Sequence, residues 1–352
     1  MSPNPLVGAV VVRDGEILGE GYHAGPGKAH AEVDALSKVS DPAGAAVICT
    51  LEPCSHHGRT PPCTDALLAA GISRVVVGAL DPLERGREQG ARVLRDRGVD
   101  VVVADGADEA ACRDLNSAFI TWAISRRPEV TLKLATSLDG KIATATGESQ
   151  WITGPDARRR VHRMRADRDA VAVGVGTALA DDPSLTARDV SGDVRQPVRV
   201  VFDSLGRLPV DGGLVRTASD IPVIVIASAE APDDSVRALE RAGVEVIRVE
   251  GDEQSRARRG LELLAERDIQ SVLVEGGSGL AAAILEADVV DRVVWMLAPM
   301  LIGGTAAPSA LGDPGVAALA DAPRLVDVEI EAIGDDLVVA GRLHPLPMTE
   351  GD

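Results

Sequence analysis

The chain has 352 residues, of which 45% are hydrophobic and 26% charged, and its formal net charge is −18 at pH 7. This length accommodates two domains of ordinary size. So acidic a chain argues against nucleic acid as a partner, because nucleic acids bind clustered Lys and Arg. No apolar run approaches the ~20 residues of a membrane-spanning helix, and no signal peptide is apparent. We therefore expect a cytoplasmic protein that binds no membrane.

The first third of the chain alternates between strand and helix patterns. Two apolar runs, 6–12 and 17–22, flank Asp14-Gly15 and predict a β-hairpin. After the hairpin we expect helix 29–39, strand 45–50, helix 63–70, strand 74–79, helix 86–97, strand 100–103 and helix 108–125. This order predicts an α/β layered domain.

The segment Ser125-Arg126-Arg127-Pro128 is a charged, proline-containing break, and it predicts two domains, residues 1–126 and 127–346. The second domain contains predicted strands 130–136, 170–175, 198–202, 223–227, 244–249, 271–275, 292–298, 325–332 and 337–343, with helices 155–166, 233–242, 255–267 and 279–287. Because no helix separates the last two strands, we expect a mostly parallel sheet with an antiparallel edge.

The stretch from His30 to Cys63 carries the strongest chemical signal. His30, Cys54 and Cys63 supply one imidazole and two thiols, three ligands that leave the fourth position of a tetrahedral zinc ion open. Glu32 is too close to His30 along the chain to be a further ligand. It is well placed to move protons for a water whose pKa the metal lowers to about 7. We predict a catalytic Zn²⁺ site rather than a closed structural one.

This arrangement, H-x-E followed by P-C and a second Cys, resembles the zinc nucleobase deaminases, in which the Glu is the general acid/base. Eight residues separate the two cysteines, where nucleoside and tRNA deaminases usually have two. The insert PCSHHGRTPPC looks like the riboflavin-pathway deaminases, which act on a pyrimidine carrying ribose phosphate. The resemblance implies a cytidine-deaminase-like α/β/α layered domain, with the pyrimidine and its phosphate held by Asn4, His23, His56 and Arg59.

Two segments of the second half have patterns typical of phosphate binding. Val274 to Gly279 ends a strand and opens a helix, and its glycines let backbone N–H groups approach a phosphate. It is not the G-x-G-x-x-G dinucleotide fingerprint, and a plain strand-to-helix turn is the alternative. A run of arginines between Arg158 and Arg168 crowds one helix, where one face could meet a phosphate while the rest are solvated.

The strings LKLATSLDGKIA, GESQWITG, GVGTALADDPSLTAR, VFDS, VEGGSG and LAPMLIGG resemble the reductase half of the bifunctional riboflavin-biosynthesis deaminase/reductases, whose fold is similar to dihydrofolate reductase. The resemblance implies that NADPH lies along Ala135, Trp151, Thr177, Asp181, Ser204 and Gly277. It places the ribose-phosphate substrate at Ser149, Arg165, Leu185, Arg188 and Glu275. Lys133 and Asp181 are expected near the hydride-transfer centre, and which of them handles a proton stays open. It also implies a homo-oligomer.

The resemblance to the riboflavin-pathway family therefore predicts zinc-dependent hydrolytic deamination of 2,5-diamino-6-(5-phosphoribosylamino)pyrimidin-4-one, followed by NADPH-dependent reduction of the ribosyl chain to ribityl. Two features depart from the family pattern. The family usually has a helix before the Ser2-Pro3-Asn4-Pro5 segment, and its Asp-Pro-Asn-Pro segment here reads Asp81-Pro82-Leu83-Glu84, without the amide. An alternative reading is a reductase with a weak or inactive zinc-binding deaminase-like domain. A nucleic-acid base deaminase with an accessory domain is disfavoured by the acidic charge and the cysteine spacing.

Overall fold

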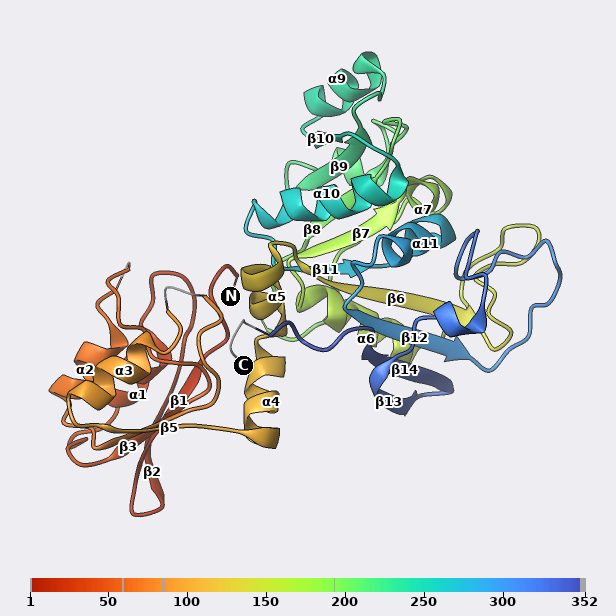
Figure 1. Ribbon diagram of the computed structural model, residues 1–352. Coiled ribbons are helices and arrows are strands. Elements are labelled where there is room, and N and C mark those ends of the chain that lie inside the picture. The colour runs from red at the N-terminus through yellow and green to blue at the C-terminus, as the bar shows by residue number, and fades with distance from the viewer. Residues whose placement is uncertain (1, 59, 84–85, 193, 349–352) are drawn as a thin grey trace. The chain divides into compact units, whose positions relative to one another are not determined.

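The computed structural model describes residues 2–58, 60–83, 86–192 and 194–348 (Figure 1). Its described residues divide into two compact units, the first made of residues 2–126 with 346–348 and the second of residues 127–345. Among the described helices, none has the length and apolar character needed to cross a bilayer.

The first unit is built on a five-stranded sheet with the order β2-β1-β3-β4-β5. Strand β1 is antiparallel to β2 and β3, whereas β3, β4 and β5 are mutually parallel. The predicted hairpin turn is confirmed, since Asp14 and Gly15 both adopt positive φ, 52° and 83°, as a tight two-residue turn requires. The strands are β1 (Gly8–Arg13), β2 (Glu16–Tyr22), β3 (Ala46–Cys49), β4 (Arg74–Val77) and β5 (Asp100–Val103).

Three helices, α1 (Ala31–Leu36), α2 (Cys63–Ala69) and α3 (Gln89–Asp96), lie side by side in the first unit (Figure 1). Helix α1 packs directly on β1 and β2 because Gly21 has no side chain. A Cβ at Gly21 would lie 2.3 Å from the carbonyl oxygen of Ala31. This close approach fixes the start of α1, which carries residues of the predicted zinc site.

The predicted helix 108–125 is wrong as a single element. It is two helices, α4 (Gly106–Leu115) and α5 (Ser117–Ser125), separated at Asn116. The Asn116 side chain is buried and brackets the backbone of Leu6, whose N–H donates to Oδ1 at 2.8 Å and whose carbonyl accepts from Nδ2 at 3.0 Å. Asn side chains that bond to the backbone compete with helix continuation, and this one anchors the segment before β1.

The second unit contains a nine-stranded sheet with the order β10-β9-β8-β7-β11-β6-β12-β14-β13. All neighbouring pairs are parallel except β12 with β14 and β14 with β13, which confirms the predicted antiparallel edge. The strands are β6 (Glu129–Ser137), β7 (Ala170–Gly174), β8 (Val198–Phe202), β9 (Val223–Ser228), β10 (Glu245–Val249), β11 (Ser271–Val274), β12 (Arg292–Ala298), β13 (Val326–Ile333) and β14 (Asp336–Arg342).

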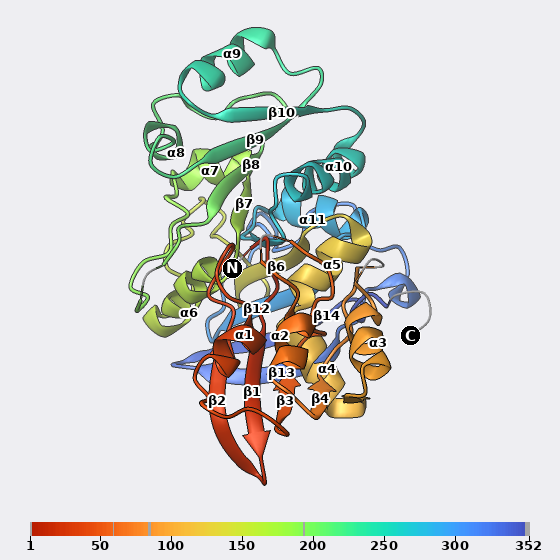
Figure 2. The same ribbon diagram turned by 90° about the vertical axis from the view of Figure 1, so that its left-hand side faces the viewer.

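Helices cover both faces of this sheet, so its central strands are apolar on both sides. In β7, Ala170 and Ala172 belong to the core that includes residues of α10 and α11, while Val171 and Val173 belong to the core on the opposite face. Figure 2 shows α10 and α11 next to each other. The helices are α6 (Pro155–Ala166), α7 (Val175–Asp181), α8 (Gly213–Arg216), α9 (Asp233–Arg241), α10 (Glu253–Ala265), α11 (Ser278–Glu286) and the 3₁₀ helix η1 (Leu319–Asp321).

Helices α7 and α8 were not among the predicted elements. Their lengths of seven and four residues are too short to give a 3.6-residue hydrophobic period.

The Asn116 bracket should contribute measurably to the stability of the first unit. Replacing Asn116 by Ala leaves two backbone groups of Leu6 without their partners, and we expect the free energy of unfolding to fall by about 1–2 kcal/mol. Denaturant unfolding measures this loss. Lys38→Ala, at an exposed side chain of the same unit, is the control and should change stability by no more than about 0.5 kcal/mol. Equal effects of the two substitutions would contradict the anchoring role.

Candidate metal centre and cofactor cavity

Three segments of the first unit bring His30, Cys54 and Cys63 together. His30 directly precedes α1, Cys54 follows β3 after a short loop, and Cys63 is the first residue of α2. The Nδ1 atom of His30 lies 3.1 Å from the Cys63 sulfur and 3.5 Å from the Cys54 sulfur, and the two sulfurs are 3.5 Å apart. The three ligand atoms lie within 4.8 Å of one another, close enough to bind one metal ion.

The electrostatics of the two thiols fit a metal-binding pair. The hydrogen bond from Cys63 lowers the pKa of Cys54 to about 4, helped by His30 and the backbone N–H of Cys63. The same contact raises the pKa of Cys63, and the Cys54 sulfur raises the pKa of His30. The lowered pKa favours the thiolate form of Cys54, and a divalent cation favours deprotonation of the second thiol as well.

The orientation of the His30 ring is fixed by a contact at the nitrogen that points away from the two cysteines. Its Nε2 atom lies 3.3 Å from the hydroxyl oxygen of Thr60, which leaves Nδ1 facing the two sulfurs. Ligand histidines are commonly held in this way, through a hydrogen bond from the nitrogen that does not meet the metal.

Glu32 lies in the first turn of α1 and is only 3% exposed. Burial raises the pKa of its carboxyl, because desolvation disfavours the charged form. A carboxyl group with a raised pKa holds a proton more readily than an ordinary one, as a group that first accepts and then donates a proton must. Glu32 is therefore suited to the proton-transfer role that the sequence predicts.

Asn4 and His23 lie together beside His30. His23 is 4% exposed, and its Nδ1 donates to the carbonyl of Ala29 at 2.9 Å. This leaves Nε2 as an acceptor for the Asn4 amide at 2.7 Å. The His23 ring meets that of His30 edge-on, with centroids 5.2 Å apart. His56 is exposed in the loop between the two cysteines, and the predicted residue Arg59 lies outside the described residues.

Glu52 is a residue near the site that the sequence analysis missed. Its buried carboxylate accepts backbone N–H groups of Asp81, Glu88 and Ala91 at 2.9–3.2 Å. The signal for Glu52 in the sequence was an acidic residue directly before Pro53-Cys54, with no Lys or Arg close by to pair with it. Glu52 ties the loop after β4 to the segment that carries Cys54.

The loop after β4 also contains Leu83, where the family has an amide. Leu83 packs against an apolar cluster formed by Leu51, Ala79 and Phe119, and its N–H donates to the Asp81 carboxylate at 2.9 Å. This position therefore has an apolar packing role in the first unit.

The second unit contains a cavity of about 950 Å³ over the carboxyl ends of its central parallel strands. Clefts at the carboxyl ends of parallel strands are the usual ligand sites of open α/β sheets. All twelve predicted residues of this unit line it: Lys133, Ala135, Ser149, Trp151, Arg165, Thr177, Asp181, Leu185, Arg188, Ser204, Glu275 and Gly277.

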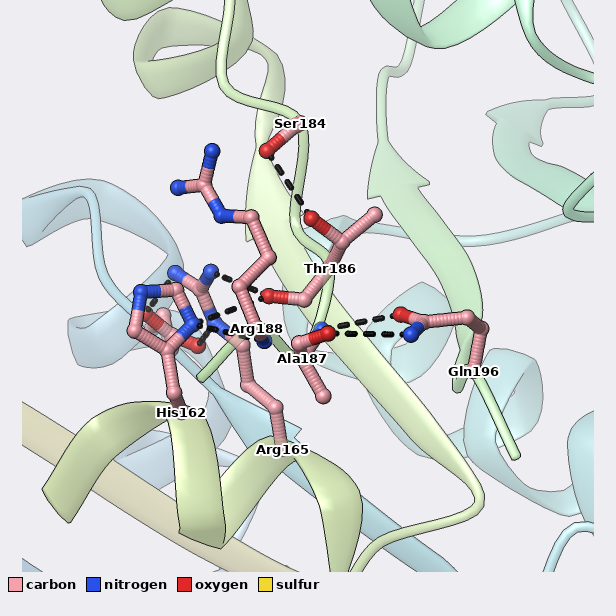
Figure 3. A network of polar contacts seen from close by, with 8 residues as sticks. His162, Arg165, Ser184, Thr186, Ala187, Arg188 and Gln196 are labelled. Atoms are coloured by element: carbon pink, nitrogen blue, oxygen red, sulfur yellow. Dashed lines mark hydrogen bonds and ion pairs between the residues drawn. The ribbon is translucent and has the colours of Figure 1, made fainter. Parts of the chain in front are cut away.

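A network of polar contacts shapes one wall of this cavity (Figure 3). The Arg165 guanidinium from α6 binds the Glu275 carboxylate, with Nη2 2.8 Å from Oε2. Its Nη1 donates to the carbonyl of Thr186 at 2.9 Å, and Nδ1 of His162 donates to the same carbonyl at 3.1 Å. The loop that carries Leu185 and Arg188 is thereby held against α6.

The opposite side of the same loop is fixed by Gln196. Its side-chain amide brackets Ala187, accepting from the backbone N–H and donating to the carbonyl, both at 2.9 Å (Figure 3). Among the described residues, no side chain bonds to the Arg188 guanidinium, which remains available to a ligand. His162 and Gln196 were missed by the sequence analysis, since a single His in an arginine-rich helix and a Gln in a loop carry no recognisable pattern.

Charged groups in the cavity have shifted pKa values. Burial disfavours the ionised form of Glu275, but the ion pair with Arg165 outweighs it and the pKa of Glu275 is lowered. Burial lowers the pKa of Lys133, although Glu275 opposes the shift. The pKa of His162 is likewise lowered, by burial and by Arg165. The hydroxyl of Ser149 lies 3.5 Å from the Asp181 carboxylate.

The glycine-rich turn after β11 opens onto the cavity. Gly277 has a φ of 80°, and a Cβ there would lie 3.0 Å from the hydroxyl of Thr177. Helix α11 starts at Ser278, so its free N–H groups border the cavity, and a helix N-terminus favours phosphate. The guanidinium of Arg158, which also lines the cavity, stacks 4.5 Å above the ring of the exposed Trp151.

Comparisons with known proteins agree with this arrangement. The RibD C-terminal domain family matches residues 128–339, and the zinc-binding region of cytidine and deoxycytidylate deaminases matches residues 1–79. The riboflavin biosynthesis protein RibD of Aquifex aeolicus is 40% identical over 96% of this chain and 92% of its own.

Solved structures show the same relationship. A diaminohydroxyphosphoribosylaminopyrimidine deaminase/5-amino-6-(5-phosphoribosylamino)uracil reductase from Thermotoga maritima superposes with a TM-score of 0.84, at 38% identity over 97% of this chain and 93% of its own. RibD of Acinetobacter baumannii gives a TM-score of 0.85 at 34% identity over 97% and 92% of the two chains. With its deaminase-like metal centre, its cavity-bearing second unit and relatives that match along nearly its whole length, this chain belongs to the RibD family of riboflavin biosynthesis proteins.

Proposed function

We propose that this chain catalyses two consecutive steps of riboflavin biosynthesis. The first unit deaminates 2,5-diamino-6-(5-phosphoribosylamino)pyrimidin-4-one, and the second reduces the ribosyl chain of the product to ribityl with NADPH. The observation that carries the proposal is the pairing of a His-Cys-Cys centre beside a buried Glu with a separate cavity lined by all twelve predicted reductase residues. We place the enzyme in the cytoplasm and expect a homo-oligomer that engages neither nucleic acid nor membrane.

In the deaminase unit, His30, Cys54 and Cys63 would hold Zn²⁺. When bound, zinc supplies Lewis acidity and lowers the pKa of a water molecule. The Glu32 carboxylate accepts a proton from the attacking water and delivers it to the departing amine. Asn4, His23, His56 and Arg59 are proposed to hold the pyrimidine and its ribose phosphate. The hydrogen bonds that fix His23 make its ring a rigid wall of this site.

In the reductase unit, the chain mainly positions the two reactants and excludes water. Ala135, Trp151, Thr177, Asp181, Ser204 and Gly277 are proposed to contact NADPH. Ser149, Arg165, Leu185, Arg188, Glu275 and Lys133 are proposed to contact the substrate, whose phosphate the unpaired guanidinium of Arg188 can bind bidentately. Lys133, with its lowered pKa, can release a proton more readily than an ordinary lysine, and Asp181 remains the other candidate for proton transfer.

We expect one zinc ion per chain. Cys54→Ser removes a thiolate ligand, so zinc content after dialysis should fall well below one equivalent, and the first unit should unfold more readily because metal binding contributes folding free energy. Metal analysis of the dialysed protein and thermal unfolding measure the two effects. Cys112→Ser, at a half-buried cysteine away from the three ligands, is the control and should retain zinc. Full zinc content in Cys54→Ser would reject the ligand set.

The two activities should separate by mutation. Glu32→Gln keeps the shape of the side chain but removes the proton carrier, so ammonia release should fall by about a hundredfold or more. NADPH oxidation with the deaminated substrate should persist. Asp181→Asn or Lys133→Ala should instead lower NADPH oxidation and leave ammonia release unchanged. Product masses with and without NADPH follow both reactions, and loss of both activities in Glu32→Gln would contradict the assignment of one reaction to each unit.

A substitution at Leu83 distinguishes a fully active deaminase from a weak one. Its packing against Leu51, Ala79 and Phe119 favours a structural role. We therefore expect Leu83→Asn to lower the free energy of unfolding by about 1–3 kcal/mol, because an amide would replace apolar contacts, without raising deaminase efficiency. A tenfold or larger rise in deaminase kcat/KM would instead show that the missing amide limits the first reaction and would support the reductase with a weak deaminase-like domain.

A further inference from the structure

Two of the strings typical of the reductase family contain residues that take no part in the proposed ligand contacts. In LKLATSLDGKIA these are residues 138–141, which follow β6, and in LAPMLIGG they are residues 300–304, which follow β12. All of these residues are described, and none of them lines the cavity. Because β6 and β12 are parallel neighbours, the two segments leave the same end of the sheet side by side (Figure 1). This is the end that carries the cavity.

The carboxylate of Asp139 joins the two segments. Its Oδ1 accepts the backbone N–H of Ile302 at 3.0 Å and the hydroxyl of Ser137 at 2.6 Å. Its Oδ2 accepts the backbone N–H of Gly303 at 2.7 Å. The Ser137 hydroxyl and the two N–H groups lower the pKa of Asp139 to about 2, so the carboxylate is charged at neutral pH. We call Asp139 with the N–H groups of Ile302 and Gly303 the Asp139 clip.

A second set of contacts continues from the clip along the chain. Nζ of Lys141 donates to the carbonyl of Ala307 at 2.9 Å and to the hydroxyl oxygen of Ser309 at 3.3 Å. The backbone N–H of Ile142 donates to the carbonyl of Pro308 at 3.0 Å. The chain after β6 is therefore bound to the chain after β12 at several successive positions.

The chain that these contacts hold leads directly into the cavity. Ile142 lines the cavity, and Ser149 and Trp151 follow it in the same stretch. Residues 142–153 are all described and contain no helix or strand, so no regular ladder of backbone hydrogen bonds fixes their position. A backbone anchor at the start of such a stretch limits how far its later side chains can move.

We propose that Asp139 is a positioning residue of the reductase, because its clip fixes the start of the stretch that carries Ser149 and Trp151. The inference rests on the proposed reductase function, in which Ser149 meets the substrate and Trp151 meets the cofactor. Asp139 lies outside the cavity and acts through these two side chains. Displacements of about 1 Å at such groups can lower a rate about a hundredfold, so loss of the clip should affect the reaction although no ligand contact is removed.

Fluorine NMR of the protein labelled with 5-fluorotryptophan tests the positioning without turnover. The chain has three tryptophans, and Trp151→Phe identifies the Trp151 signal. Asp139→Ala should shift or broaden this signal and leave that of Trp122, in the first unit, unchanged.

Turnover measures the consequence for the reaction. With the deaminated substrate, Asp139→Ala should lower kcat/KM for NADPH oxidation at least about tenfold, while ammonia release by the first unit persists. Asp139→Asn keeps one side-chain carbonyl oxygen as an acceptor, so it should retain part of the lost activity.

Asp169→Ala is the matched control. The Asp169 carboxylate also accepts two backbone N–H groups, from Gln270 and Ser271, together with the Ser271 hydroxyl. Asp169 directly precedes β7, at the end of the sheet away from the cavity. Its substitution should destabilise the second unit but leave the Trp151 signal unchanged and reductase kcat/KM within about twofold.

Either an unchanged Trp151 signal or an undiminished reductase kcat/KM in folded Asp139→Ala would overturn the inference. Equal losses of kcat/KM in Asp139→Ala and Asp169→Ala would also overturn it, because they would show a general effect of stability. Failure of the unsubstituted protein to oxidise NADPH with the deaminated substrate would instead reject the proposed reductase function. The Trp151 signal would still decide whether the clip positions this stretch.

Discussion

The cavity of the second unit depends on the concentration of positive charge in a chain that is strongly negative overall. With a net charge of −18, the average field repels phosphorylated ligands, so binding must come from local groups. Six cationic side chains meet this requirement by lining one cavity: Lys133, Arg158, Arg165, Arg188, Arg207 and Arg256. Two of the carboxylates that line the same cavity are engaged, since Glu275 pairs with Arg165 and Asp203 with Arg207, and Asp181 and Glu253 line it as well.

Much of this arrangement could be predicted from the sequence. The alternation of elements in the second unit, its antiparallel edge and the convergence of His30, Cys54 and Cys63 all followed from local patterns. These features were accessible because strand and helix periods and ligand spacing are properties of short stretches of chain. The resemblance to a known family then located the residues that line the cavity.

The features that were missed depend on contacts between distant segments. Nothing around Asn116 indicates that it would bond to Leu6, 110 residues away, and interrupt a helix. The role of Glu52 depends on three N–H groups, those of Asp81, Glu88 and Ala91, which lie 29 to 39 residues further on. Arg256 shows the same difficulty, because it is one of several arginines on its helix, and only the fold shows which of them faces the cavity.

The metal centre depends on glycines that let backbone segments lie close together as much as it depends on its three ligands. Gly21 allows α1 to lie against β2, and this contact fixes the positions of His30 and Glu32 at the start of the helix. At Gly90, a Cβ would lie 1.8 Å from the carbonyl oxygen of Pro53, so the start of α3 can press against the segment that carries Cys54. Larger side chains at these two positions would displace the ligand segments without touching a ligand. The glycines therefore constrain the site as strictly as the residues that perform the chemistry, since displacements of about 1 Å are enough to impair catalysis.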